Sequence, residues 1–292
     1  MVIVNLHQFP TPATGRLIAF TTPQNYAIRL SRLIHLNGWT PLSCPTVTVD
    51  PTPATISALQ NFLLPPNFPI RHFSALAFTS RTGIAAFSEA LAGIDAHPLA
   101  PIGELLTISA LGKDSELLDS HFIGRLCENP RRIRVLVPQV ATPSGLVAAL
   151  GLGSGRKVLC PVPAVIGLRE PPVVPKLLAD LERRGWEAVR VDAYETRWRS
   201  GVAELVEKMG EECGVDAIFF TSTAEVEGLL KSLAEVGLDW GRVRKMCPRM
   251  VAAAHGPVTA AGAEKLGVGI DVVSSRFDSF QGLVEALQYR WN

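Results

Sequence analysis

The chain has almost no excess of charge of either sign, and this limits the partners it could bind. Its 292 residues carry 28 basic and 27 acidic side chains, which leaves a formal net charge of +1. Nucleic acids and anionic membranes attract proteins that carry an excess of positive charge. We therefore expect no nucleic-acid partner and no membrane partner, and an anionic ligand would have to be bound by local groups.

Cysteine is also scarce, and its spacing is not that of a metal site. No two cysteines stand in C-x-x-C spacing, and their number is odd. This pattern favours buried thiols in a reducing compartment over a disulfide framework or a zinc site, so we expect no metal. The five cysteines are Cys44, Cys127, Cys160, Cys213 and Cys247.

Long hydrophobic runs are missing as well. No apolar run reaches the ~18–20 residues of a membrane span. The first residues, MVIVNLHQFPTPATGR, lack the basic start and apolar core of a secretory signal. With 47% hydrophobic residues and a mean hydropathy of +0.22, the chain can still form a large core. We expect a soluble, intracellular protein of one large or two ordinary domains.

The common catalytic motifs are absent. There is no G-x-S-x-G, so no nucleophile elbow is indicated. The glycine-rich stretch at 151–156, GLGSGR, lacks the lysine of a phosphate-binding loop and precedes a strand instead of following one. This stretch is therefore interpreted as a flexible connector.

What the sequence does contain is a regular alternation of short apolar runs and helical patterns. Such alternation predicts an α/β fold with doubly wound parallel sheets. The expected strands of the first half are RLIAFTTP (16–23), PLSCPTVTV (41–49), SALAFTS (74–80) and LLTISALG (105–112).

Landmarks of the first half recur in the second half in the same order. We interpret this as an internal duplication that gives two similar α/β units. The duplication does not decide whether the chain is cut once near 150 or whether the halves exchange pieces. The matching pairs are 16–20 with 156–160, 38–39 with 185–186, 75–91 with 217–233, and 109–120 with 252–264.

Two F-T-S triplets occupy equivalent places in the repeats. Thr79-Ser80 and Thr221-Ser222 each end a predicted strand and precede a predicted helix. In open α/β sheets, ligands bind outside the carboxyl ends of strands, where hydroxyls and free helix N–H groups can hold an anion. Ordinary helix N-caps are the alternative interpretation for each triplet.

The stretch His255-Gly256-Pro257-Val258-Thr259 opens another predicted helix. Glycine permits a sharp turn, proline suits the first helical position, and the helix dipole favours a carboxylate there. Its first-repeat counterpart runs from Leu111 to Ser115, with a helix expected from Asp114, and a charged surface turn is the alternative interpretation of that copy. We interpret both as candidate anion-binding turns, whereas His255 alone is more often a structural residue.

Tyr194 lies at a predicted strand end in the stretch VDAYETRW. A tyrosine hydroxyl can donate or accept a proton and has an unperturbed pKa of about 10. An interface aromatic without a chemical role is the alternative interpretation.

Taken in order, these pieces resemble the uroporphyrinogen-III synthase family of tetrapyrrole biosynthesis. The resemblance covers nearly the whole chain. The pieces are a first strand ending in T-P, the two F-T-S strand ends, Y-x-T at Tyr194 and Thr196, G-P-x-T-A at Gly256 to Ala260, and S-x-x-x-L-V-x-A-L at Ser279 to Leu287.

The resemblance implies an exchanged domain cut. One domain would contain 1–44 and 198–292, and the other would contain 50–192. Connectors at 45–49 and 193–197 would join them as two antiparallel strands, with the substrate between the domains. The family also implies a monomer, in the cytoplasm or, for a processed plant chain, in the plastid stroma.

The resemblance further implies a reaction without a cofactor. The substrate would be a linear tetrapyrrole, hydroxymethylbilane. It loses its terminal hydroxyl, the last pyrrole ring is inverted through a spiro intermediate, and the macrocycle closes with loss of water. By position, Tyr194 would assist the departing hydroxyl. The residues that would bind substrate carboxylates are Thr79, Ser80, Ser115, Thr221, Ser222, Gly256 and Thr259.

Two departures from the family pattern keep an alternative open. The first strand usually ends in T-R-P, whereas this chain has Thr22 in place of the arginine. After Cys160 the expected turn is replaced by a proline-rich stretch (161–175), which we interpret as an ordered but irregular excursion. A paralogue that binds a tetrapyrrole in a regulatory role without catalysis is therefore the second hypothesis. A two-domain solute-binding protein is a third, and the Y-x-T and G-P-x-T-A matches disfavour it.

Overall fold

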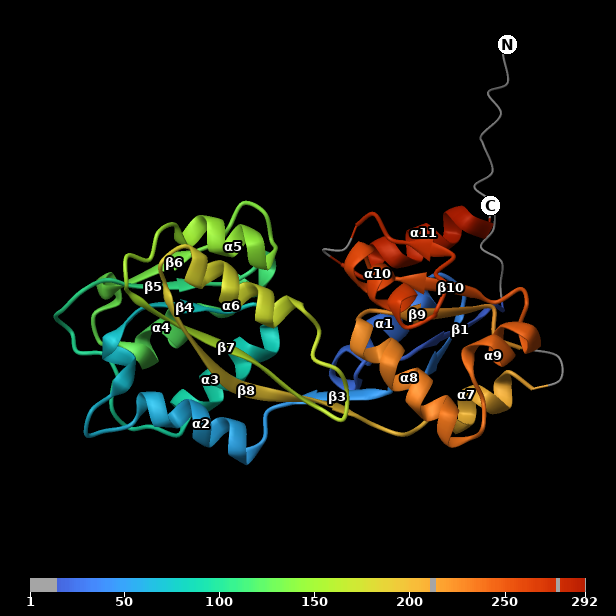
Figure 1. Cartoon of the computed structure of the whole chain (residues 1–292), viewed down its shortest axis with the longest axis horizontal. Coiled ribbons are helices and arrows are strands. Elements are labelled where there is room, and N and C mark those ends of the chain that lie inside the picture. The colour runs from blue at the N-terminus through green and yellow to red at the C-terminus, as the bar shows by residue number, and fades with distance from the viewer. Residues whose placement is uncertain (1–14, 211–213, 277–278, 292) are drawn as a thin grey trace, which may run out of the picture. The chain divides into compact units, whose positions relative to one another are not determined.

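The computed structural model describes residues 15–210, 214–276 and 279–291, and the chain divides into two compact units. Unit 1 comprises Met1–Thr48 and Arg197–Asn292, and unit 2 comprises Val49–Thr196. The chain passes from one unit to the other within two strands, β3 (Val47–Asp50) and β8 (Glu187–Trp198) (Figure 1). Unit 1 is thus built from the two parts of the sequence that flank unit 2.

Unit 1 contains a five-stranded sheet in the order β11-β10-β9-β1-β2, and all four strand pairs are parallel. Parallel neighbours need crossover connections, which here include the helices that follow β1, β9 and β10. Its described elements are β1 (Leu17–Phe20), α1 (Gln24–Leu36), β2 (Thr40–Ser43), α7 (Ala203–Lys208), β9 (Ala217–Phe220), α8 (Thr223–Glu235), α9 (Trp240–Met246), β10 (Val251–Ala254), α10 (Pro257–Lys265), β11 (Val272–Val273) and α11 (Gln281–Trp291).

Both faces of this sheet are buried. Ile18 and Phe20 of β1 point to the face that α1 and α11 cover, while Ala19 points to the face covered by α7, α8 and α9. Successive side chains of a strand face opposite sides, so a strand covered on both sides is apolar throughout. This arrangement confirms the predicted doubly wound α/β fold for unit 1.

Strand β2 is an edge of this sheet and contains Pro41. The N–H groups of Thr40 and Cys44 donate inward, to the carbonyls of Arg16 (2.8 Å) and Phe20 (2.9 Å) in and beside β1. Because N–H direction alternates along a strand, Pro41 stands at a position that faces outward. Its missing N–H therefore costs the sheet no hydrogen bond.

Unit 2 is built around the other sheet, which has six strands in the order β3-β8-β7-β4-β5-β6. The pairs β7–β4, β4–β5 and β5–β6 are parallel. Besides β3 and β8, its elements are α2 (Pro53–Leu63), η1 (Pro69–His72), β4 (Phe73–Ala77), α3 (Arg81–Ala92), β5 (Leu106–Ser109), η2 (Gly112–Leu117), α4 (Ser120–Leu126), η3 (Pro130–Arg132), β6 (Ile133–Leu136), α5 (Pro143–Leu150), β7 (Lys157–Ile166) and α6 (Val173–Arg183).

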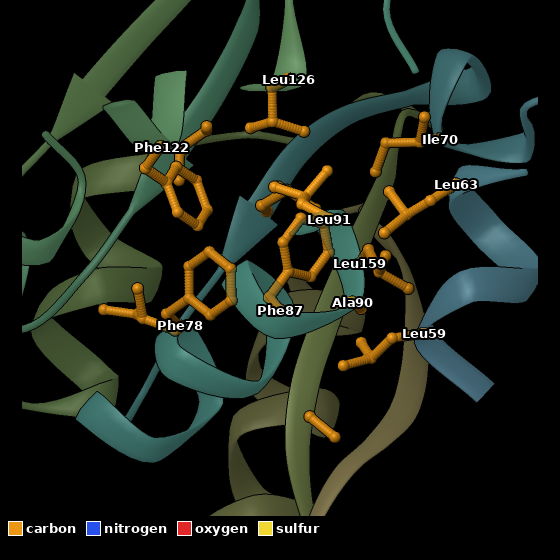
Figure 2. Packing of buried hydrophobic residues seen from close by; sticks show 14 of the residues in the cluster. Leu59, Leu63, Ile70, Phe78, Phe87, Ala90, Leu91, Phe122, Leu126 and Leu159 are labelled. Carbon is orange, nitrogen blue, oxygen red and sulfur yellow. The ribbon is translucent and has the colours of Figure 1, made fainter. Parts of the chain in front are cut away.

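An aromatic cluster in the core of unit 2 lies at the end of β4. Phe78, which follows β4 directly, meets Phe87 of α3 and Phe122 of α4 with ring centroids 5.5 and 6.2 Å apart (Figure 2). Such edge-on pairs add to the free energy gained by burying the rings. The three rings fix the end of β4, and the F-T-S triplet that begins with Phe78 is thereby held in place.

The proline-rich stretch after Cys160 is more regular than the sequence suggests. Strand β7 continues through Pro161 and Pro163 to Ile166. Its pairing with β4 ends at Leu159, so the prolines lie beyond the segment where that ladder needs donors. The expectation of an irregular excursion is therefore wrong up to Ile166.

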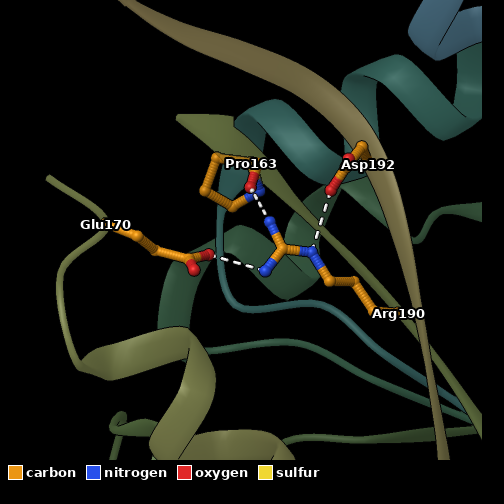
Figure 3. Close-up of polar contacts among 4 residues, drawn as sticks. All are labelled: Pro163, Glu170, Arg190 and Asp192. Atoms are coloured by element: carbon orange, nitrogen blue, oxygen red, sulfur yellow. Dashed lines mark hydrogen bonds and ion pairs between the residues drawn. The ribbon is translucent and has the colours of Figure 1, made fainter. Parts of the chain in front are cut away.

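Arg190 of β8 holds the loop between β7 and α6. Its guanidinium donates to the carbonyl of Pro163 (3.0 Å) and to the carboxylates of Glu170 (2.6 Å) and Asp192 (2.9 Å) (Figure 3). A guanidinium presents several donors in one plane, so a single side chain can join three segments.

Three of the cysteines are free and buried, as expected, namely Cys44, Cys127 and Cys160. Cys247 is disulfide-bonded, so the expectation of thiols throughout is wrong at this position. Cys213 lies outside the described residues, as do residues 1–14, on which the expectation about a secretory signal rests. Among the helices of the described ranges, none is long and apolar enough to cross a membrane.

Candidate functional site

In unit 2 the structure brings two of the predicted site residues together. The hydroxyls of Ser80 and Tyr194 are 2.9 Å apart, although 114 positions separate them in the sequence. Ser80 is the N-cap of α3, and its Oγ also accepts a hydrogen bond from the N–H of Gly83 (3.1 Å). Tyr194 comes from β8 and is 6% exposed. A phenol is thus fixed against the start of a helix.

Gly83 lets the start of α3 lie close to the backbone of β7. A Cβ at this position would lie 3.2 Å from the carbonyl oxygen of Pro161 and 3.7 Å from Cε1 of Tyr194. The first distance is shorter than an ordinary contact, so a side chain here would press against the backbone of β7, whereas the second distance is an ordinary contact. Thr79, which precedes the cap, is partly exposed and follows the buried Phe78.

Ser115 lies in the second candidate turn of unit 2. This turn is a 3-10 helix, η2, which begins at Gly112, in place of the α-helix expected from Asp114. Gly112 has a φ of 50°, a conformation that glycine adopts without strain. The hydroxyl of Ser115 donates to the carbonyl of Gly112 (2.7 Å). The hydroxyl therefore stabilises the turn itself.

Asp114 adds a negative charge beside this turn. Its carboxylate is 4.0 Å from the guanidinium of Arg81, the first residue of α3. Burial raises the pKa of Asp114 above its usual value, and the positive charge of Arg81 partly opposes this shift. An arginine and a carboxyl group thus lie next to the Ser80 end of α3.

In unit 1, the equivalent of the η2 turn begins α10. Gly256 is the N-cap residue with a φ of 91°, and Pro257 is the first helical residue. The hydroxyl of Thr259, which is 5% exposed, donates to the carbonyls of Thr221 (3.3 Å) and His255 (3.4 Å). Like the hydroxyl of Ser115, this hydroxyl stabilises its own turn. It also links the turn to the neighbouring F-T-S strand end at Thr221. His255 packs edge-on against Phe280 with centroids 5.5 Å apart.

The two repeats thus place a positive-φ glycine and a hydroxyl three residues later at corresponding strand ends. Helix geometry leaves the first N–H groups after such a turn without intrahelical acceptors. Within the described part of the chain, no group of three or more His, Cys, Asp or Glu side chains could hold a metal ion.

One cavity of unit 1 lies away from these turns. This cavity of about 680 Å³ is lined by residues of β11, of α11 and of the adjoining loops, among them Asp271, Glu285 and Tyr289. None of the predicted site residues lines it. Tyr194 lies within β8, so the expectation that it lies at a strand end is wrong, whereas the other predicted residues follow the carboxyl ends of strands, where parallel sheets bind ligands.

The sequence matches the family model described as uroporphyrinogen-III synthase HemD over residues 28–285. The chain belongs to the uroporphyrinogen-III synthase family. Membership gives it the activity of a cyclising lyase that works without a cofactor.

Solved structures of uroporphyrinogen-III synthases have the same fold. A mutant enzyme from the extremely thermophilic bacterium Thermus thermophilus is 20% identical with a TM-score of 0.57, and the match covers 94% of this chain and 99% of that chain. The enzyme from Helicobacter pylori is 16% identical with a TM-score of 0.54, covering 95% and 100%. Comparison with curated proteins gives no significant match.

In this uroporphyrinogen-III synthase family member, Glu225 also belongs to the site, although the sequence motifs did not point to it. The residue is 1% exposed, and its carboxyl group contacts both Thr221 and Ser222. Burial raises the pKa of Glu225, and hydrogen bonds from Thr221, Thr21 and Ser222 act in the opposite direction. The S-x-x-E spacing from Ser222 to Glu225, typical of a capping box, was the signal that could have pointed to it.

Thr21 and Thr46 were missed for a different reason. Thr21 donates to Glu225 Oε2 (3.1 Å), and Thr46 donates to the Glu225 carbonyl (2.9 Å). Both stand among unremarkable residues, and only the folded sheet brings them to α8. Next to Thr21, the buried hydroxyl of Thr22 has no hydrogen-bond partner among the described residues.

Proposed function

We propose that Tyr194 is the general acid of the reaction and that hydroxymethylbilane is the substrate. The observation that supports this role is the 2.9 Å contact between Tyr194 and Ser80. Ser80 is itself fixed by the N–H of Gly83, so the phenol has one defined orientation. A positioned acid of this kind lowers the barrier for a leaving hydroxyl.

Proton balance is consistent with this role. Tyr194 donates its proton as the terminal hydroxyl departs, and the hydroxyl leaves as water. The pyrrole carbon that closes the ring then loses a proton, which restores the phenol. The chain's main contribution is to hold a flexible substrate so that the correct carbon reacts, which is catalysis by orientation.

We propose that substrate carboxylates bind at strand-to-helix turns of both units. In unit 2 these are the turns at Thr79-Ser80 and at Ser115, and in unit 1 the turn from Gly256 to Thr259. Ser115 and Thr259 donate to carbonyls of their own turns, so the backbone N–H groups there would bind the anion. The turn at Thr221 and Ser222 differs, because an acidic side chain already contacts its donors.

The test is incubation with freshly prepared hydroxymethylbilane, followed by separation of the type I and type III isomers. Type III product is expected in excess of a protein-free control. Formation of the spontaneous type I isomer alone would overturn the activity and would favour a regulatory paralogue.

Replacing Tyr194 by Phe tests the assigned acid. We expect the rate of type III formation to fall about 10²-fold or more, since general acid catalysis contributes on this scale. Tyr289→Phe is the matched control, because Tyr289 is 88% exposed on α11. Undiminished turnover by the Tyr194→Phe variant would remove Tyr194 from the mechanism.

A further inference from the structure

Glu225 occupies in unit 1 the place that Gly83 occupies in unit 2. Each is the third residue after an N-cap serine of an F-T-S triplet. Gly83 N–H donates to Ser80 Oγ at 3.1 Å, and Glu225 N–H donates to Ser222 Oγ at 3.4 Å. The two turns are therefore built alike, and one of them carries a long acidic side chain where the other has none.

The carboxyl group of Glu225 is held by groups from two strand ends. Thr221 donates to it with both its N–H (2.9 Å, to Oε2) and its hydroxyl, and Ser222 donates with its hydroxyl (3.2 Å, to Oε1). Thr21, which follows β1, donates at 3.1 Å to Oε2. Four donors converge on one carboxyl group that is almost completely buried.

Helix capping alone does not account for this arrangement. In a capping box, the glutamate accepts a hydrogen bond from the N–H of the N-cap residue, here Ser222. Glu225 instead reaches the N–H of Thr221, one residue earlier, and the hydroxyl of Thr21, which follows the neighbouring strand β1. Its carboxyl group thus lies at the carboxyl ends of β9 and β1, the place where a parallel sheet binds a ligand.

We propose that Glu225 is a built-in occupant of this carboxyl-binding turn and excludes a substrate carboxylate from it. The proposal rests on the proposed function. Thr221 and Ser222 then bind the chain's own carboxyl group, whereas in the equivalent turn of unit 2 Gly83 stands in place of the glutamate and Ser80 contacts the hydroxyl of Tyr194. Glu225 is thereby a specificity-determining residue that makes the two repeats unequal in how many carboxylates they accept.

The test removes the carboxyl group of Glu225 from the turn and adds a small carboxylate to the solution. Glu225→Ala removes the γ-carbon and the carboxyl group, and acetate contains the same atoms. The variant is expected to melt several degrees below the wild type, because four donors lose their acceptor. Acetate is expected to restore part of this loss in proportion to the logarithm of its concentration, whereas chloride at equal ionic strength is not.

Three controls make the response specific. The wild type and Glu225→Gln, in which the turn stays filled, are expected to show no acetate effect beyond that of chloride. Glu227→Ala lies on the same helix and removes a carboxylate that pairs with Lys231, so it should behave like the wild type. A Glu225→Ala protein that folds only in acetate would also support the proposal.

Equal melting of Glu225→Ala in acetate and chloride would overturn the proposal. If the variant folds in neither salt, the melting temperature of the wild type is compared in acetate and in chloride. A higher melting temperature in acetate would overturn the proposal, because a filled turn has no room for acetate. No turnover is needed for these readouts. A failure of the wild type to form type III product would therefore reject the proposed function without affecting this result.

Discussion

Two neighbouring buried threonines after β1 differ in their hydrogen bonding. Thr21 donates to Glu225 and is part of a satisfied buried network. Thr22 is equally buried, but its hydroxyl has no partner among the described residues. A buried hydroxyl without a partner costs free energy that an apolar group of the same shape avoids.

Thr22→Val is therefore expected to raise the free energy of unfolding by about 1 kcal/mol. Thr21→Val, its neighbour, should lower it by about 1–3 kcal/mol, since Glu225 would lose a donor. Urea denaturation of both variants measures the two changes. A loss of stability in Thr22→Val would show that its hydroxyl stabilises the fold.

Glu225 predicts a pH dependence of stability. Burial raises its pKa in the folded chain above the value of an unfolded glutamate. Between these two values the folded state holds a proton that the unfolded state has released, so the free energy of unfolding falls as pH rises through this window.

The difference in unfolding free energy between the wild type and Glu225→Gln should accordingly decrease as pH rises above about 4.3, the usual glutamate value. The variant has no titrating group here, so all other groups cancel in the difference. Urea denaturation from acidic to neutral pH provides the measurement. A difference that stays constant, or rises with pH, would contradict a raised pKa.

Among the elements, helix α8 approaches the backbone of another segment unusually closely. A Cβ at Gly228 would lie 2.7 Å from the carbonyl oxygen of Thr46. Gly124 in α4 is the opposite case, because a Cβ there would meet nothing within 4 Å. Substituting each of these two helical glycines by alanine therefore distinguishes the effect of helix propensity from the effect of packing.

We expect Gly124→Ala to stabilise the protein by about 0.8–1 kcal/mol, the usual helix preference for alanine. Gly228→Ala should instead destabilise it by about 1–3 kcal/mol, because the backbone of Thr46 would have to move. Thermal unfolding of both variants tests this pair. Equal stabilisation by both substitutions would show that the backbone of Thr46 can move at little cost in free energy.

The sequence predicted the elements well where burial follows a simple period. The apolar runs that became β1, β4, β5 and β9 are largely buried, and their alternation with helices led directly to the confirmed fold class. It was less informative at β7, where prolines suggested an irregular stretch. A proline disrupts a strand only where its N–H is needed, and that depends on neighbours that lie far away in the sequence.

The candidate site shows the same limit. Matching triplets pointed to Ser80, and Y-x-T pointed to Tyr194, but only the fold shows that their hydroxyls meet. The spacing from Ser222 could mark Glu225 only as a capping residue, whereas its partner at residue 21 lies 204 positions away. The roles of the site residues stay predictions until the variants are measured.

At the scale of the whole molecule, each unit has its own hydrophobic core. In unit 2 the core includes Phe78, Phe87 and Phe122, and unit 1 contains separate clusters on the two faces of its sheet. A core that is complete within one unit gives that unit its own cooperative unfolding.

Phe87→Ala is expected to lower the stability of unit 2 by about 3–5 kcal/mol. Hydrogen exchange followed by mass spectrometry should show faster exchange in peptides from β4 and β5. Peptides from β9 and β10 serve as the internal control and should exchange as in the wild type. Equal acceleration in both units would mean that they unfold as one.

The edge of the unit 1 sheet at β2 has a consequence for how copies of the chain meet. A strand from a second molecule could extend this sheet only by pairing with outward N–H and C=O groups. Within β2 the outward positions are Pro41 and Ser43, and Pro41 offers no N–H. A four-residue edge with a single outward donor is a poor template for strand addition, so the chain is protected on this side against aggregation through its own backbone.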